Sequence, residues 1–249
     1  MTVRMALASL LLLALSGCAN LAYYAQAVGG HIQVMHSAQP IPRLIEAPET
    51  APALKKKLLT VADIRDFASR ELALPDNDSY RSYADLGRPY VVWNVFAAEE
   101  FSVEPEKWCM VVVGCVNYRG YYSRQAAERF AQTLRNDGLE TYVAGIPAYS
   151  TLGFFDDPVL NTFLRFGELE VARTIFHELA HQVAFVRGDT TFNESFATTV
   201  ENEGMRRWLA RHGNEAERQV FLNRQQRKAH FLALLGDYRN RLREIYAQP

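Results

Sequence analysis

The spacing of hydrophobic and polar residues predicts a chain that is helical at both ends. In residues 53–74 the apolar positions recur every three or four residues, which is the period of one helix face, and Pro75 follows the pattern. The same period predicts helices over residues 159–187, 193–212 and 214–247. Each of these segments has an apolar face that we expect to pack in a core.

Residues 20–39 also have a helical pattern, but a pair of glycines interrupts it. We expect Gly29-Gly30 to break or loosen this helix, because glycine inside a helix costs about 1 kcal/mol relative to alanine. The helix should stop before Pro40, and the proline-rich residues 40–52 are predicted to form a short linker.

The middle of the chain has a different period. Residues 88–101, 109–122 and 139–149 are rich in β-branched and aromatic side chains and are separated by turn signals, as strands are. One helix is predicted among them, over residues 123–138, with Gly138 as its cap. The fold class predicted from these elements is α+β and mainly helical, with a small, mostly antiparallel sheet.

The N-terminus has the features of a lipoprotein signal peptide over residues 1–17. Arg4 precedes an apolar run that is too short to span a membrane, and Leu15-Ser16-Gly17-Cys18 follows it. We expect Cys18 to become the lipidated first residue of the mature chain; the alternative is an ordinary secretory signal with an incidental cysteine. Ala19 stands where an aspartate would retain a lipoprotein in the inner membrane. By resemblance to Gram-negative sorting, this predicts the periplasmic face of the outer membrane.

Removal of the signal leaves a single predicted domain over residues 18–249. The chain has 27 basic and 28 acidic residues, so its charges nearly balance and no basic footprint for nucleic acid stands out. The Lys triplet at 55–57 is interpreted as a solvated helix face. The sequence leaves the oligomeric state open.

Two further cysteines, Cys109 and Cys115, could form a disulfide in an oxidising compartment. A regular strand between them would hold their α-carbons about 20 Å apart, which is too far for a bond. The disulfide therefore requires the chain to fold back near Gly114, and we expect that it does.

The segment RTIFHELAHQVAF, residues 173–185, has the pattern H-E-x-x-H. On a helix His177 and His181 are roughly 40° and about 6 Å apart, so both imidazoles can reach one metal ion. Glu178 can then reach a water at that ion without being a ligand. The apolar positions gather on the opposite side of the helix: Leu169, Ala172, Ile175, Phe176, Leu179, Val183 and Val186. The alternative is a helix that carries two histidines without a metal, but a chance match on so amphipathic a segment is improbable.

A catalytic zinc needs three protein ligands and one open position. The other histidines, His31, His36, His212 and His230, lie in segments where a surface or core role is expected. In TTFNESFATTVENEG, residues 190–204, Asn193 resembles an N-cap, and Glu194 and Glu201 both border the inward face of the predicted helix. A carboxylate that points at a core is costly unless it is paired or binds a metal.

HELAHQ followed by NESFATTVE resembles the gluzincin metallopeptidases, in particular the alanyl-aminopeptidase type, in which H-E-x-x-H is followed by N-E-G-F-A. The resemblance implies a gluzincin-like domain in which Glu194 is the third zinc ligand; the 12-residue spacer from Gln182 to Asn193 is shorter than in those enzymes. Glu201, two turns farther along, suits a hydrogen bond that orients a ligand. Over nearly its whole mature length the chain is also similar to bacterial lipoproteins described as predicted aminopeptidases, through SYADLGRPYVVWNVFA, GCVNYRGYY and AYSTLGFFDDP.

These residues together predict a zinc-dependent peptidase of the cell envelope that acts on peptides with Glu178 as general base. Gluzincins commonly stabilise the oxyanion with a tyrosine or histidine, and Tyr149 is the first candidate here, ahead of Tyr121 and Tyr122. Asp156-Asp157-Pro158 is instead expected to start the following helix. The competing hypothesis is a non-catalytic lipoprotein that uses the zinc fold as a scaffold or binding module; the presence of Glu178 argues against it, because a structural site needs no base.

Overall fold

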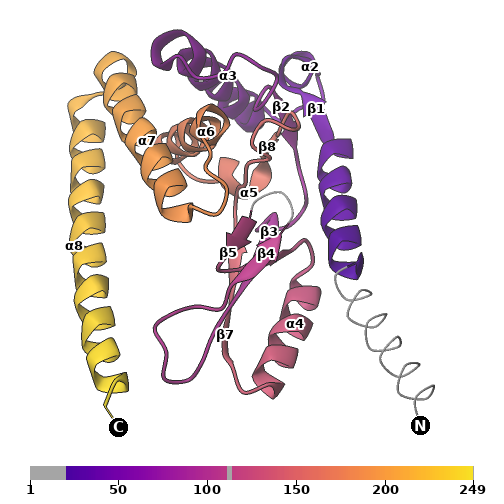
Figure 1. Ribbon diagram of the computed structural model, residues 1–249. Helices are drawn as coiled ribbons and strands as arrows, with labels where there is room; N and C mark the ends of the chain where they lie inside the picture. Colours follow the sequence, from indigo (N-terminus) through magenta and orange to yellow (C-terminus); the bar gives the residue numbers. More distant parts are fainter. Residues whose placement is uncertain (1–20, 111–113, 249) are drawn as a thin grey trace.

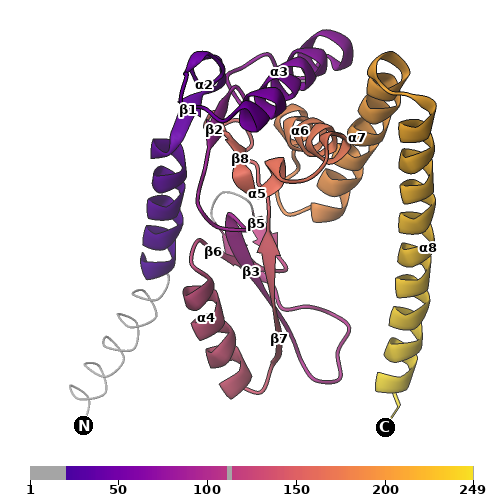
Figure 2. The ribbon, with the colours of Figure 1, turned by 180° about the vertical axis from the view of Figure 1, so that it is seen from behind.

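The computed structural model describes residues 21–110 and 114–248. Its upper half in Figure 1 is mainly helical and its lower half contains most of the sheet structure. A helix over residues 21–36 runs down one side, and α8 (Glu215–Tyr246) runs down the other. Both ends of the described chain point to the bottom of the molecule, in Figure 1 and in the reverse view of Figure 2.

The helical half is built around α3 (Pro52–Leu72), α6 (Glu168–Val183) and α7 (Thr190–His212). Pro52 is the first residue of α3, where its missing N–H costs nothing, and Ala73 ends the helix in a left-handed conformation. The larger hydrophobic core lies between these helices and includes Leu58, Ile64, Phe67, Ile175, Phe176, Leu179, Met205 and Trp208. The helix predicted over residues 53–74 is confirmed.

Two three-stranded sheets and a two-stranded hairpin complete the fold in the described residues. In the upper half β1 (Ala38–Pro40) pairs antiparallel with β2 (Ser82–Ala84), which pairs in parallel with β8 (Val159–Leu160). In the lower half β3 (Val92–Ala98) lies between β6 (Arg119–Tyr121) and β7 (Glu140–Ile146), and both pairings are antiparallel. The α+β, mainly helical fold class with small, mostly antiparallel sheets is therefore confirmed.

A smaller core holds α4 (Arg124–Asn136) on this lower sheet. It contains Trp93, Val95, Tyr121, Ala127 and Ala131. The Ser123 hydroxyl caps α4 by accepting from the Ala126 N–H, and Gly138 follows the helix with a φ of +89°. The helix expected over residues 123–138 is thus present.

The hairpin of β4 (Trp108–Met110) and β5 (Gly114–Val116) contains the two described cysteines. Cys109 and Cys115 are directly opposite in the antiparallel register and are joined by a disulfide. Gly114 has a φ of +80°, a conformation that favours glycine. Cys18 and the predicted signal peptide over residues 1–17 lie outside the described residues. Within the described ranges, no helix is long and apolar enough to cross a membrane.

Two predictions about the N-terminal segment are wrong. The helix over residues 21–36 continues through Gly29-Gly30, and a Cβ at Gly30 would collide with the Tyr122 ring, so this glycine serves a close approach between segments. The expected linker over residues 40–52 contains a further helix, α2 (Ile41–Glu46), whose Ile41 is buried in the larger core. In both cases tertiary packing outweighs the local glycine and proline signals.

The helix predicted over residues 159–187 is also not continuous. Its first part forms β8 and the short α5 (Asn161–Leu164), and Gly167 then caps the start of α6. Asn161 begins α5, and its side chain bonds to a different segment of the chain. It accepts from the Leu86 N–H and donates to the Arg88 carbonyl. Asp156-Asp157 consequently precedes a strand and starts no helix.

Candidate metal centre

Helix α6 holds its two histidines by burying the opposite face. Ala172, Ile175, Phe176 and Leu179 are fully buried against the larger core. Val183 and Val186, which were expected on the same apolar face, are 53% and 46% exposed, because α6 ends at Val183 and the chain turns away from the core. The predicted amphipathic helix is therefore present but ends sooner than the apolar pattern suggested.

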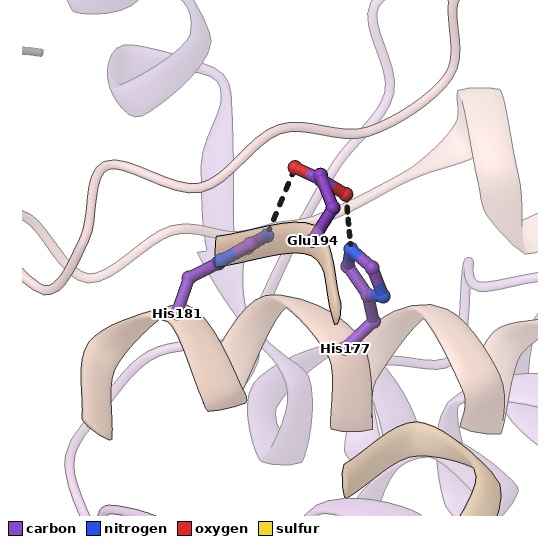
Figure 3. A group of neighbouring side chains, drawn as sticks. All are labelled: His177, His181 and Glu194. Atoms are coloured by element: carbon purple, nitrogen blue, oxygen red, sulfur yellow. Dashed lines mark ion pairs between the residues drawn. The ribbon is translucent and has the colours of Figure 1, made fainter. Parts of the chain in front are cut away.

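His177 and His181 lie one turn apart on this helix, with ring centroids 4.9 Å apart. His177 is half-buried and His181 is buried. Both rings direct Nε2 toward the start of α7, where the Glu194 carboxylate lies (Figure 3). His177 Nε2 is 3.3 Å from one Glu194 oxygen, and His181 Nε2 is 3.7 Å from the other.

The three side chains fit a metal ion. One ligand atom from each of His177, His181 and Glu194 can be chosen so that all lie within 4.8 Å of one another. Two imidazole nitrogens and one carboxylate oxygen are a donor set that zinc uses in catalytic sites with a remaining open position. Glu194 is 56% exposed, so this cluster is open to solvent on the α7 side.

Asn193 fixes the connection that brings Glu194 to the histidines. Its Oδ1 accepts from the Val186 N–H at 2.7 Å, and its Nδ2 donates to the Val186 carbonyl at 2.8 Å. Asn193 is 3% exposed, so both bonds are shielded from water. The expectation that Asn193 is the N-cap is wrong, because Asp189 caps α7 by accepting from the Phe192 N–H. Asn193 instead clamps the loop that joins α6 and α7.

Glu201 supports His177 from the other side of its ring. Its Oε2 is 3.0 Å from His177 Nδ1, and its Oε1 accepts from Arg173 Nε at 2.6 Å. Glu201 is 4% exposed, so this chain of contacts is buried. A carboxylate at Nδ1 fixes the ring orientation and the tautomer that leaves Nε2 free for a metal. Glu194 and Glu201 are seven residues apart on α7 and meet the His177 ring at different nitrogens. Glu194 lies at Nε2 and Glu201 lies at Nδ1.

The charges of these groups depend strongly on one another. Burial alone would lower the pKa of His177, but its hydrogen bonds with Glu194 and Glu201 raise the pKa to about 9. Burial and the neighbouring His177 lower the pKa of His181. Burial, together with the negative charge of Glu194, raises the pKa of Glu178 to about 7, although His177 opposes the shift. The ionisation of Glu178 is therefore linked to the charges of His177 and Glu194.

A family model described as "Putative aminopeptidase" matches residues 22–249. The chain belongs to this family. No curated protein and no solved structure matches the chain significantly. Membership indicates a peptidase-like role for the protein.

In this member of the putative aminopeptidase family, the tyrosines predicted to stabilise the oxyanion make other contacts than those that join His177, His181 and Glu194. The Tyr149 hydroxyl is 2.7 Å from His31 Nδ1, and its ring packs against Tyr122. Burial raises the pKa of Tyr149. Tyr121 is buried in the smaller core. Among the described residues, none of these three tyrosines has a hydrogen bond to His177, His181 or Glu194, and the assignment of Tyr149 stays a prediction.

Tyr118 is a neighbour of the cluster that sequence analysis missed. Burial raises the pKa of Tyr118, with smaller contributions from the negative charges of Glu194 and Glu178. The fold brings it there because β5 contacts the loop between α6 and α7: a Cβ at Gly114 would lie 2.9 Å from the Gly188 nitrogen. No local motif around Tyr118 signals this approach.

Asp157, which the sequence predicted only as part of a helix start, is a buried carboxyl group that influences Glu178. Asp157 is 2% exposed, and its Oδ2 accepts from the Thr151 N–H at 2.7 Å and from the Thr151 hydroxyl at 2.9 Å. Burial raises the pKa of Asp157 to about 6 despite these bonds. The protein thus has a buried ionisable group, Asp157, whose negative charge contributes to the raised pKa of Glu178.

Proposed function

We propose that this chain is a zinc-dependent peptidase of the bacterial cell envelope. The observation that carries the proposal is the convergence of His177, His181 and Glu194, with Glu178 adjacent to the first histidine on the same helix. Membership of the aminopeptidase family supports the same reaction class. Zinc held by these three residues would supply a Lewis acid that polarises a peptide carbonyl and makes water a stronger nucleophile.

Within that reaction the protein residues have separate tasks. Glu178 accepts the proton of the attacking water and donates it to the departing amine, so the peptide bond is replaced by a carboxylate and a free amine. Glu201 holds the His177 ring through Nδ1 and keeps Nε2 directed at Glu194. Asn193 maintains the distance between the two helices that carry the ligands.

The signal-like sequence of residues 1–17, followed by Cys18, supports a location in the cell envelope. We propose that lipid chains on Cys18 attach the protein to the periplasmic face of the outer membrane. Mass spectrometry of the membrane fraction should find a diacylated or triacylated Cys18 as the first residue. A mature chain that is unmodified and wholly soluble in the periplasm would reject this part of the proposal.

Three glutamate substitutions test the chemical roles. Glu194→Ala should lose stoichiometric zinc and all activity, because it removes a ligand. Glu178→Gln should retain zinc but lose turnover, because the base is not a ligand. Glu201→Ala should retain zinc, with an affinity about 10–100-fold lower, and should lose part of the activity. Zinc content is measured by elemental analysis and turnover with a mixed peptide library, with and without a chelator.

Glu203→Ala is the matched control for these variants. Glu203 is on the same helix but is paired only with Arg206 and Arg207 among the described residues, so its loss should change neither zinc nor turnover. A Glu194→Ala protein that still holds one tight zinc overturns the ligand assignment. Stoichiometric zinc without chelator-sensitive cleavage of any peptide would instead favour a non-catalytic scaffold.

A further inference from the structure

A groove with a volume of about 330 Å³ lies between α6, α7 and α8, on the Nδ1 side of His177. Its apolar walls come from Leu169, Phe221, Ala229 and Leu232. The volume falls in the range of about 300–1,000 Å³ that is usual for small-molecule sites. The groove is separate from the open side of the cluster, where Glu194 meets both histidine Nε2 atoms.

The charged groups of the groove are not balanced. Three cations line it, namely Arg173, Arg224 and Lys228, against the two carboxylates of Glu170 and Glu201. Both carboxylates already have partners, because Glu170 is paired with Arg173 and Arg224, and Glu201 is paired with Arg173 and bound to His177. Within the described ranges, Lys228 has no carboxylate partner.

Arg224 and Lys228 are four residues apart on α8, so they project from the same side of that helix at the rim of the groove. A ligand that complements this arrangement has an anionic head at the rim and an apolar body against the leucines and Phe221. A cationic or purely polar ligand would leave either the charge or the apolar walls uncompensated.

The groove is connected to the metal centre by a chain of charged contacts. Arg173 binds Glu170 through Nη1 at 2.7 Å and Glu201 through Nε at 2.6 Å, and Glu201 reaches His177 Nδ1 at 3.0 Å. An anion that takes Arg224 away from Glu170 leaves Glu170 to bind Arg173 more strongly. Glu201 is then shared less with Arg173 and becomes a better acceptor for His177, which strengthens that histidine as a ligand.

We propose that this groove is a regulatory site for an amphiphilic carboxylate and that its occupation tightens metal binding at His177. The site deepens the proposed function and rests on it for the identity of the metal centre. A fatty acid and a peptide with an apolar C-terminus both offer the required carboxylate and apolar body, so the test includes one probe of each kind.

Isothermal titration calorimetry with the purified full chain tests the binding. Octanoate, kept below its micelle concentration, and N-acetyl-Leu-Leu are the probes, and octylamine and acetate are controls that lack the anionic head or the apolar body. We expect one saturable site for at least one of the two carboxylate probes, and none for the controls. The stronger probe identifies whether a fatty acid or a peptide end fits better.

Lys228→Gln should weaken this binding about tenfold, the loss expected for one charge-assisted contact. Arg227→Gln is the matched control, because Arg227 is adjacent on α8 but does not line the groove. Absence of saturable binding by both carboxylate probes overturns the proposal. Equal effects of the two substitutions would do so too.

The coupling is measured by zinc competition with a chromogenic chelator. A saturating carboxylate probe should tighten zinc binding about fivefold, at the low end of ordinary coupling between two sites. The effect should be smaller in Lys228→Gln at the same probe concentration, because this variant binds the probe about tenfold more weakly, and it should return when the probe concentration is raised about tenfold. Unchanged zinc affinity at saturation rejects the regulatory role. These readouts do not require peptide turnover, so they distinguish failure of this site from failure of the peptidase proposal.

Discussion

Helices α6 and α8 are held in the molecule in different ways. Seven of the 16 residues of α6 are buried, whereas Phe221 is the one buried residue among the 32 of α8, all of which are described. Arg218 ties the start of α8 to the carbonyls of Leu209 and Gly213, and Arg239 and Arg243 tie its other end to Glu104. Two of the three residues that could hold a metal ion, His177 and His181, thus lie on the element fixed by the core.

The difference indicates which parts can move. A shift of α6 would disturb close-packed side chains, whereas a shift of α8 would mainly exchange exposed ion pairs, which are worth about 0–1 kcal/mol each. Exposed apolar residues along α8, such as Phe231 and Leu235, have no core contacts to lose. We therefore regard α6 as the rigid support of the candidate metal centre and α8 as the adjustable wall of the groove.

Phe176→Ala is the strongest test of the rigid side. Phe176 is 0% exposed and packs against Phe67, with ring centroids 5.9 Å apart. Its truncation should lower the free energy of unfolding by about 4 kcal/mol, through lost burial and the cavity left behind. Urea denaturation of the zinc-free protein measures this. A loss below about 1 kcal/mol would mean that α6 is not held by its core.

Asn193→Ala tests how much the two Asn193 hydrogen bonds in the α6–α7 loop contribute to stability and to zinc affinity. Two buried hydrogen bonds disappear and leave the Val186 N–H and carbonyl without these partners, so stability should fall by about 2 kcal/mol. Zinc affinity should fall about 10–100-fold, because Glu194 is the next residue. Asn202→Ala is the control, since the Asn202 side chain accepts from Gln225 on α8. Unchanged zinc affinity in Asn193→Ala would contradict a positioning role.

Asp157→Asn tests how much stability the folded protein loses when the buried Asp157 carboxyl group ionises. The folded-state pKa of Asp157 is raised from 3.8 to about 6, so the folded protein binds this proton more tightly than the unfolded chain. The native protein consequently loses stability from this group as the pH rises through 3.8 to 6 and remains at the lower value above that range. An asparagine can still accept from Thr151 and does not ionise.

The measurement for Asp157→Asn is the unfolding free energy at several pH values. Relative to the substituted chain, the native protein should lose about 1–1.5 kcal/mol between pH 5 and pH 8. Asp237→Asn on α8 is the control, because it makes the same substitution at an exposed residue that pairs with Arg241 on its own helix. Parallel pH profiles for native protein and Asp157→Asn would show that Asp157 does not ionise on this scale.

The sequence predicted features that depend on short-range periodicity. The helix carrying His177 and His181 was evident because a four-residue spacing and an apolar face lie within one segment. The continuous helix at Gly30 and the proximity of Tyr118 to Glu194 and Glu178 were not predictable in this way. Gly30 fits against Tyr122, and Gly114 against Gly188, so both depend on contacts between segments far apart in the chain.

The third-ligand position shows an intermediate case. Glu194 could be assigned by a motif, and the structure brings its carboxylate to both histidines. The clamp by Asn193 could not be derived, because it binds a backbone seven residues earlier in a loop whose path the pattern did not give. Sequence patterns therefore specified the chemical groups better than the contacts that position them.

Phe231→Ala is the smallest expected effect and completes the comparison with Phe176→Ala. The substitution removes the same side chain, but Phe231 is 58% exposed on α8 and belongs to neither hydrophobic core. The unfolding free energy should therefore change by less than about 0.5 kcal/mol, and zinc affinity should not change. The same urea titration and chelator competition apply to both variants. A loss approaching that of Phe176→Ala would mean that α8 is covered in solution, for example by a second copy of the chain, and a dependence of the loss on protein concentration would identify that cover. If the loss is small and independent of concentration, Phe231 adds little to the packing of α8, and contacts elsewhere, such as the ion pairs to Glu104, hold the helix.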